Sequence, residues 1–453
     1  MRSLNKGFFF VFLILLLGAT LVFKSGLLKL NSNPRLIDRL PTSDYLVRLK
    51  SLGFSKEINA ILFKYKLPVR EFASPDFLLS QAKHHGINIQ SEAYLFFNQS
   101  RDEWGGLVPL TDSSKIINGI ERFRKNTEVL DSSIEDVRVF HFPEIEAIVA
   151  YEKNYLFIYR GNKFKKRLEE IRNTKQGSIR PSWKRFLSRK ALKNEKLVVY
   201  SESPMIKEWG FDYVLFAHDN DTVNLHVKCL LYSYTPHGIK LKSSYQGLDK
   251  SPQDSKSIEL HLHPSFKTTY TGKALMAKLN SYGRKISFPT TTFFDVWNGD
   301  LSFREGGVVN STQKIVVSEF DENFNVREVI KYEQIQVPGY AVVFNTHDNG
   351  MKFINAMFAK GLLHTEEQRL RFLFSPLLRM NKVDSNYMFT SAAFFPPLVD
   401  KPENHMLWSY EGTPFLVTFE KIRRNSIELN VQFQAKPLIK YLQKNKTKKK
   451  GQS

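Results

Sequence analysis

The chain has 453 residues, 42% of them hydrophobic and 25% charged, a composition typical of a folded protein long enough for two domains. Its 66 basic residues outnumber 45 acidic ones, and the formal charge of +21 favours polyanionic partners such as nucleic acid, anionic lipid or phosphorylated substrates. The single cysteine, Cys229, excludes an intrachain disulfide. The sequence contains no P-loop, G-x-S-x-G or H-E-x-x-H pattern, which excludes most nucleotide-driven enzymes, serine hydrolases and zinc peptidases.

The N-terminal region contains one long apolar run. Residues 7–23 carry no charge and follow a short basic tail, residues 1–6. Seventeen apolar residues are enough for a short membrane-spanning helix, and we expect an uncleaved signal-anchor, with a cleaved signal peptide as the alternative. The expected protein is a single-pass type II protein of the Golgi or endoplasmic reticulum membrane, with its C-terminal domain in the lumen.

The chain beyond this run divides into further segments by composition and periodicity. We expect a stem (24–50), a small accessory α/β domain (51–160), a basic connector (161–195), a catalytic domain (196–435) and a basic disordered tail (436–453). Apolar spacing predicts a helix from about Ser51. Short strands are predicted over Glu92–Phe97, Val137–Phe142, Ala147–Tyr151 and Tyr155–Tyr159.

Residues 160–196 hold the densest positive charge. They contain fourteen basic and three acidic residues, which is +11 of the total +21. No zinc spacing, stacking signature or other nucleic-acid motif accompanies this charge, so we expect no nucleic-acid partner. The segment is interpreted as a solvated helical connector, or as a surface for a phosphate-bearing donor or acceptor or for lipid.

Strand signals dominate the C-terminal domain. Strands are predicted over Lys196–Tyr200, Phe211–Ala217, Val227–Tyr234, Ile258–Leu262, Ile315–Phe320 and Tyr340–Phe344, and helices over Gly272–Tyr282 and residues 351–363. His261 and His263 alternate on one of these strands, and without a third ligand of matching spacing they are interpreted as paired surface histidines.

A polar corner follows the strand at Phe211–Ala217. Asp219 and Asp221 form a D-x-D pair, which suits a divalent cation held against a diphosphate, because hard cations prefer several oxygen ligands. The alternative is a solvated turn, since these residue types favour turns. His218 and Asn220 lie in the same corner and are candidate substrate-binding residues.

A second acidic candidate lies in Phe293–Asp300. Asp295 follows two phenylalanines in an apolar run that predicts a strand, and a buried acid must be paired, protonated or metal-bound. Asp295 is therefore a candidate catalytic base or third metal ligand, and Trp297 and Asn298 are candidate substrate-binding residues; the alternative is a cap at a strand end. Asp300 is interpreted as a turn residue, and Asp348 or Asn349 as lying near a helix N-cap.

The two acidic segments, His218–Leu225 and Phe294–Gly299, resemble the D-x-D and apolar-Asp-Val segments of the fukutin/LicD-like phosphotransferase family. The resemblance implies a nucleotidyltransferase-type fold and transfer of a phospho-alcohol or phospho-sugar from a CDP-linked donor to a glycan, with Mg²⁺ or Mn²⁺ on Asp219 and Asp221. The family's Gly-Thr-x-Leu-Gly-x-x-Arg segment is absent before the D-x-D pair.

The expected fold class is therefore mixed α/β, with an N-terminal transmembrane helix, a small accessory domain and a nucleotidyltransferase-like or GT-A-like mixed-sheet domain. The expected function is protein glycosylation by a membrane-anchored transferase, with a glycan acceptor, a nucleotide-linked donor and partner transferases. A metal-dependent nucleotide-sugar glycosyltransferase and a catalytically inactive glycan-binding or accessory protein of the same fold are the alternatives.

Overall fold

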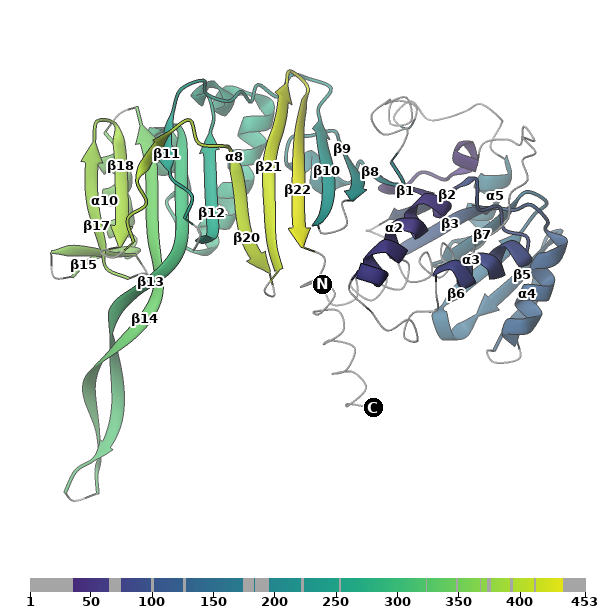
Figure 1. Ribbon diagram of the computed structural model, residues 1–453, viewed down its shortest axis with the longest axis horizontal. Helices are drawn as coiled ribbons and strands as arrows, with labels where there is room; N and C mark the ends of the chain where they lie inside the picture. Colours follow the sequence, from purple (N-terminus) through teal and green to yellow (C-terminus); the bar gives the residue numbers. More distant parts are fainter. Residues whose placement is uncertain are drawn as a thin grey trace. The chain divides into compact units, whose positions relative to one another are not determined.

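The computed structural model describes residues 36–64, 75–98, 102–124, 128–173, 183, 195–220, 224–251, 254–322, 324–347, 349–366, 368–372, 376–391, 394–410 and 413–434. The chain forms two compact units (Figure 1). Unit 1 contains residues up to Lys207 together with Tyr213–Leu230, and unit 2 contains Glu208–Asp212 together with Leu231 onward.

Unit 1 is an antiparallel sheet with short helices. Its strands are β1 (Tyr45–Lys50), β2 (Glu92–Asn98), β3 (Glu103–Pro109), β4 (Leu130–Ile134), β5 (Val137–Phe142), β6 (Ala147–Tyr151), β7 (Tyr155–Arg160), β8 (Leu197–Ser201), β9 (Tyr213–Asn220) and most of β10 (Asn224–Tyr232). Its helical elements are η1 (Leu36–Arg39), α2 (Ser51–Lys64), α3 (Pro75–His84), α4 (Ser114–Arg124), η3 (Pro143–Ile145), α5 (Phe164–Asn173) and most of α7 (Pro204–Glu208). The strands lie in the order β10-β9-β8-β1-β2-β3-β7-β6-β5-β4.

A buried ion pair fastens α5 to the sheet of unit 1. Arg167 donates from Nε and Nη2 to the two oxygens of Glu103 at 2.5 and 2.9 Å, and Tyr159 donates to the same carboxylate at 2.9 Å. Burial raises the pKa of Glu103, but the hydrogen bonds from Arg167 and Tyr159 outweigh it and hold this pKa below its ordinary value. Arg167 belongs to the basic segment 160–196, and its guanidinium is thus structural.

Unit 2 is also built on antiparallel strands. Its strands are β11 (Gln246–Leu248), β12 (Asp254–His261), β13 (Trp297–Phe320), β14 (Val326–Thr346), β15 (Leu363–Glu366), β16 (Arg369–Phe372), β17 (Leu378–Val383), β18 (Asn386–Ser391), β19 (Leu398–Asp400), β20 (His405–Tyr410), β21 (Thr413–Arg423) and β22 (Ser426–Gln434). Its helical elements are η5 (Pro264–Thr268), α8 (Tyr270–Lys285), α9 (Thr290–Val296) and α10 (Met351–Ala359). The main sheet has the order β22-β21-β20-β12-β13-β14-β18-β17-β16-β15, and β11 pairs with β19 separately.

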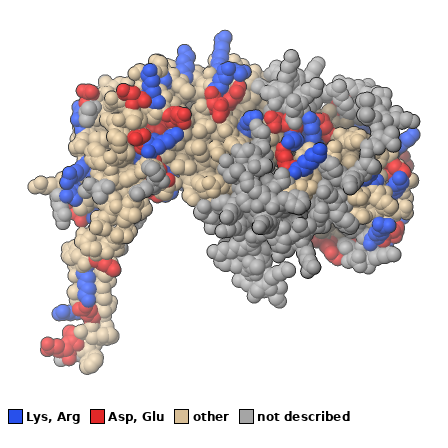
Figure 2. Space-filling view, viewed as in Figure 1, with Lys and Arg blue, Asp and Glu red and all other residues tan. Residues whose placement is uncertain are grey.

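The hairpin of β13 and β14 continues beyond the sheet as a long two-stranded arm, defined here as residues 312–334 (Figure 1). Its strands remain paired as far as Phe320 and Val326. Lysines, arginines and acids alternate with other residues along the face of the arm shown in Figure 2. Phe320 and Phe324, near its tip, are 70% and 84% exposed.

Many predicted elements are confirmed, but the predicted fold class is wrong. Strands form at Glu92–Asn98, Leu197–Ser201 and Asp254–His261, and helices at Tyr270–Lys285 and Met351–Ala359. The pairs whose register the structure describes are antiparallel, so neither unit has the mixed sheet of a nucleotidyltransferase-like or GT-A-like domain. Periodicity shows that a strand exists, whereas its pairing depends on contacts distant in sequence.

The predicted membrane anchor, residues 7–23, lies outside the described residues. Within the described ranges, no helix is long and apolar enough to cross a bilayer. The described residues thus give no support to the predicted single-pass type II protein of the Golgi or endoplasmic reticulum, and that assignment is withdrawn.

Candidate functional site

The predicted D-x-D corner lies in unit 1. His218 is near the end of β9, with Nδ1 3.3 Å from Glu57 Oε2 and its ring edge-on to Phe54. The side chain of Asp219 and the whole of Asp221 lie outside the described residues, and so does the side chain of Asn220. Burial raises the pKa of Glu57, but hydrogen bonds from His218 and Lys196 outweigh it and lower this pKa overall. His218 thus contacts a carboxylate of unit 1.

Asp295 lies in unit 2 on a helix, α9, and not on the predicted strand. Its side chain is exposed. The partner of this helix end is the half-buried Lys267, whose Nζ donates to the carbonyls of Phe294 and Trp297 at 2.7 and 2.9 Å. An ammonium group there satisfies carbonyls that the helix leaves free and complements the helix dipole. The sequence argument for a buried acid in an apolar strand therefore fails.

The remaining predicted substrate-binding residues have structural partners. Trp297 is buried at the start of β13, and its indole Nε1 donates to the carbonyl of Asp300 at 2.6 Å. Asn298 donates to Asn345 Oδ1 at 3.1 Å. At the helix N-cap predicted near Asp348 or Asn349, Asn349 accepts from the amide of Met351 at 3.1 Å and lies beside the start of α10, as expected.

The described residues contain no candidate metal site. Among the described residues, no three His, Cys, Asp or Glu side chains form a group that could hold a metal ion. His218 is in unit 1 and Asp295 is in unit 2, so the prediction that these segments form one site has no support from either unit. Metal binding is therefore withdrawn, and the Mg²⁺ or Mn²⁺ of the sequence prediction gains no support.

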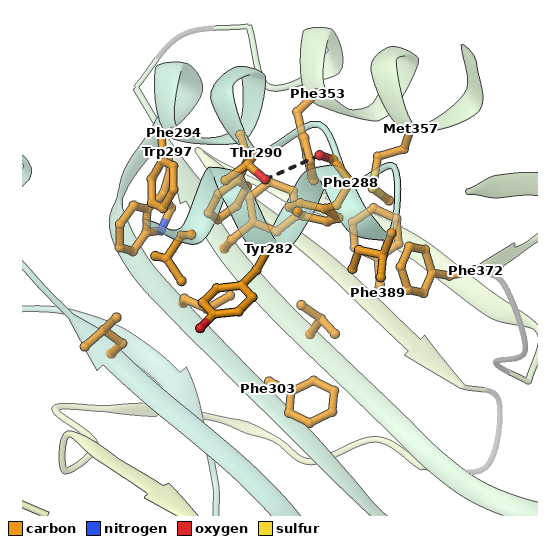
Figure 3. A pocket seen from close by; sticks show the side chains of 18 of the residues that line it. Tyr282, Phe288, Thr290, Phe294, Trp297, Phe303, Phe353, Met357, Phe372 and Phe389 are labelled. Atoms are coloured by element: carbon orange, nitrogen blue, oxygen red, sulfur yellow. Dashed lines mark hydrogen bonds between the residues drawn. The ribbon is translucent and has the colours of Figure 1, made fainter. Parts of the chain in front are cut away.

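The most prominent feature of unit 2 is an apolar cavity between its helices and its sheet (Figure 3). The cavity has a volume of about 990 Å³. Twelve of its twenty-five lining residues are Phe, Tyr or Trp. Protein cores are packed with few voids larger than a water molecule, so a space of this size is not ordinary core packing.

The strands of the main sheet form one wall of the cavity. Leu260 of β12 pairs with Leu301 of β13, and Leu301 in turn pairs with Phe344 of β14. All three side chains line the cavity. Phe303, also on β13, and Phe389, on the neighbouring strand β18, line it as well. Because side chains alternate across a sheet, the residues between them face the opposite side.

The helices form the other wall. Phe293 of α9 is central to it, with its ring 5.1 Å from that of Phe353 on α10 and 5.6 Å from that of Trp297. From α8, Leu279 and Tyr282 line the cavity at helical spacing. Helix α8 begins where Thr269 accepts from the amide of Gly272 at 3.0 Å, which is a normal N-cap.

Polar groups are scarce in the lining of the cavity. The hydroxyl of Thr290 donates to the carbonyl of Phe288 at 3.3 Å, so its polar atom already has a partner (Figure 3). Lys285 is the one charged side chain among the described lining residues, and it is exposed at the end of α8. Tyr282 and Ile286 also reach solvent, with 49% and 61% exposed. The cavity thus opens to solvent beside the C-terminal end of α8.

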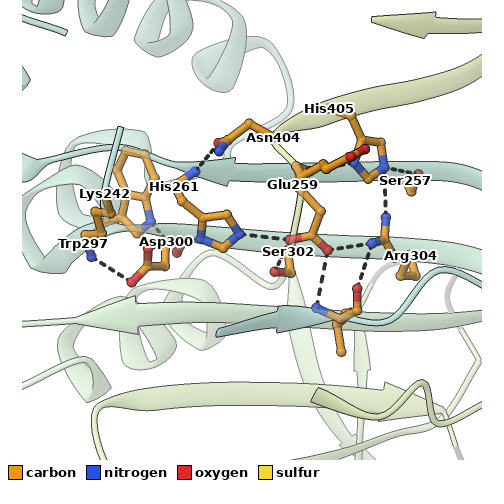
Figure 4. A network of polar contacts seen from close by, with 12 residues as sticks. Lys242, Ser257, Glu259, His261, Trp297, Asp300, Ser302, Arg304, Asn404 and His405 are labelled. Atoms are coloured by element: carbon orange, nitrogen blue, oxygen red, sulfur yellow. Dashed lines mark hydrogen bonds and ion pairs between the residues drawn. The ribbon is translucent and has the colours of Figure 1, made fainter. Parts of the chain in front are cut away.

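The opposite face of the same sheet carries a buried polar network, defined here as Lys242, Ser257, Glu259, His261, Asp300, Ser302, Arg304, Asn404 and His405 (Figure 4). Arg304 Nη2 lies 2.7 Å from Glu259 Oε1 and also donates to the carbonyl of Leu248 at 2.7 Å. Ser302 donates to Glu259 Oε2 at 2.5 Å. Gly247 of β11 packs directly over this carboxylate, because a Cβ there would lie 2.6 Å from Glu259 Oε2.

His261 is held between two acids within this network. Its Nε2 lies 3.0 Å from Glu259 Oε2 and its Nδ1 lies 3.0 Å from Asp300 Oδ1, while Lys242 pairs with the other oxygen of Asp300 at 2.6 Å. Burial lowers the pKa of His261, but the hydrogen bonds to Asp300 and Glu259 outweigh it and raise this pKa overall. The prediction that His261 is a surface histidine is therefore wrong; His263, its predicted pair, is exposed.

A serine and a histidine also meet in the network, but they are inaccessible. Ser257 Oγ lies 2.8 Å from His405 Nε2, which also faces Arg304 Nη1 at 3.1 Å. His405 Nδ1 lies 2.9 Å from the carbonyl of Glu403, so that nitrogen carries the proton. Both side chains are 2% exposed. The pair stabilises the sheet and cannot contact a substrate in this arrangement.

Comparison with known proteins adds no functional assignment. No protein-family model matches the chain, and a search of curated proteins finds no match. Among solved structures, TP0453 is similar in crystal forms IV, I and III, with TM-scores of 0.32, 0.30 and 0.33 and 10–11% identity. These alignments cover 45–48% of this chain and 81–84% of TP0453. Likeness at this level carries no argument about function.

The sequence prediction missed the cavity entirely. Its signals were present: α8 carries Leu275, Leu279 and Tyr282 at helical spacing, and Phe288, Phe293 and Phe294 form an aromatic cluster just after it. These residues are those of an ordinary core-facing helix. A sequence does not show whether the helix packs closely on the sheet or stands off from it.

Proposed function

We propose that unit 2 binds an apolar ligand of lipid size in the cavity between α8, α9, α10 and the main sheet. The observation that carries the proposal is the size of the cavity together with its lining: about 990 Å³, walled by apolar and aromatic side chains. Binding sites for small molecules have volumes of about 300–1,000 Å³, so this one suits a ligand at the upper end of that range.

The lining favours a hydrocarbon over a polar metabolite. A sugar or nucleotide would need several hydrogen-bond partners, and burying its polar groups without them costs roughly 1–3 kcal/mol each. A hydrocarbon chain needs none. Burial of about ten methylene groups gains roughly 8 kcal/mol, which offsets the several kcal/mol that association costs.

The experiment compares two variants with the same chemical change. Val342 lines the cavity from β14, whereas Val316 is exposed on the arm, outside it. Binding of the neutral fluorescent probe N-phenyl-1-naphthylamine to the full chain is titrated for the wild type, Val342→Phe and Val316→Phe. Displacement of the probe by dodecan-1-ol reports binding of a hydrocarbon chain.

We expect saturable binding by the wild type and Val316→Phe, and at least about tenfold weaker binding by Val342→Phe, because the added ring occupies part of the cavity. If the wild type does not bind the probe saturably, or if Val342→Phe binds it as the wild type does, the cavity is not the binding site and the proposal fails. Circular dichroism confirms that each variant is folded.

A further inference from the structure

We infer that the ligand of the cavity is an amphiphile with an anionic headgroup, and that Lys285 at the rim selects this group. This inference rests on the proposed function and specifies its substrate class. Among the described lining residues, Lys285 is the one with a formal charge. A ligand whose chain fills the cavity leaves its head at the rim, where the polar atoms are.

The surroundings of Lys285 leave its ammonium available to a ligand. The side chain is exposed, and no acidic partner for it is found in the described part of the chain. Its Nζ lies 5.4 Å from the centre of the Tyr282 ring, which itself lines the cavity. This cation–π contact directs the ammonium along the rim while leaving its N–H groups able to donate.

The charge of α8 favours an anion in the same place. The helix contains Lys273, Lys278, Arg284 and Lys285 and no acidic residue. Lys278 is paired with Glu208, and the other three basic side chains are exposed. Unbalanced positive charge raises the local concentration of anions and opposes cationic headgroups.

The chemistry of the head is common to two kinds of amphiphile, a carboxylate and a phosphate monoester. Both accept charge-assisted hydrogen bonds from an ammonium, which are about twice as strong as neutral ones. A neutral alcohol of the same chain length gains the burial of the chain but not the charge interaction. Comparing these three headgroups on hydrocarbon chains of the same length therefore isolates the contribution of Lys285.

The test measures displacement of N-phenyl-1-naphthylamine from the full-length protein by dodecanoate, dodecyl phosphate and dodecan-1-ol, each below its micellar concentration. It uses the wild type, Lys285→Met, Lys285→Arg and Arg284→Met. The Met substitution keeps the aliphatic length and removes the charge. Arg284→Met is the matched control, because Arg284 is adjacent and exposed but does not line the cavity.

For the wild type, Lys285→Arg and Arg284→Met we expect an anion to bind about tenfold more tightly than the alcohol. Lys285→Met should lose this preference, because its affinity for the anions should fall to its affinity for dodecan-1-ol. Preference for dodecanoate alone or dodecyl phosphate alone supports the inference and identifies the head. Equal binding of alcohol and both anions by the wild type, or an unchanged preference in Lys285→Met, overturns it. Failure of all three amphiphiles to displace the probe would instead refute the proposed function.

Discussion

The two faces of the main sheet in unit 2 use the same strands in opposite ways. On the face covered by β11, charged and polar side chains of β12, β13 and β20 are buried and bonded to one another, as with Glu259, His261 and Arg304. On the face covered by α8, α9 and α10, the alternate residues of β12 and β13, together with residues of β14, line a cavity of about 990 Å³. Burial alone therefore does not mark a functional site. The side chains of the polar face bond mainly to one another, whereas the apolar face leaves room for a ligand.

The largest expected effect comes from removing a charge from the polar face. Arg304 is fully buried and lies 2.7 Å from Glu259. Arg304→Ala should lower the free energy of unfolding by about 3–5 kcal/mol, because it leaves a buried carboxylate without its charge partner. Urea denaturation measures this loss. The control is Arg423→Ala, which removes an exposed pair with Glu428 and should cost about 1 kcal/mol or less; equal losses would show that the network is not important for stability.

A smaller, pH-dependent effect is expected at His261. Because the folded state raises the pKa of His261, its stabilisation is fully present below the unfolded value of about 6.5 and is lost as the pH rises through the folded pKa. His261→Gln should lower the free energy of unfolding by roughly 1.5–3 kcal/mol at acidic pH and by less at alkaline pH. The difference between wild-type and variant curves of unfolding free energy against pH isolates this group from His237 and His405, whose pKa values burial lowers. A difference that grows with pH would contradict the assignment.

The finest test places one change on each face of β14. Val342 lines the cavity, and Val343 is 1% exposed within the packed apolar cluster of the opposite face. Val343→Phe should destabilise the protein by about 1–3 kcal/mol, because extra volume in a packed core forces its neighbours apart. Val342→Phe should leave the free energy of unfolding nearly unchanged and weaken ligand binding instead. Thermal unfolding with and without dodecan-1-ol compares them; equal destabilisation by both variants would show that the cavity cannot accept added volume.

The candidate site shows where sequence reasoning failed. The apolar run Phe294–Val296 was predicted as a strand, since Phe and Val favour strands, but it forms the end of α9, and β13 begins at Trp297. Packing of Phe293 against Phe353 and Trp297 overrides that local preference. Asp300, predicted as a turn residue, is instead buried between Lys242 and His261, which come from segments 58 and 39 residues earlier in the chain.

By itself, the sequence determined the positions of ten of the described strands and of α8 and α10, because alternation and helical spacing are local properties. It also determined which residues of β12 to β14 would share a face. Only the tertiary structure decided that the strands pair antiparallel, that His261 meets two acids, and that the helices stand off from the sheet to enclose a cavity. These features depend on contacts between residues distant in sequence and on the volume left between packed elements, neither of which a local pattern contains.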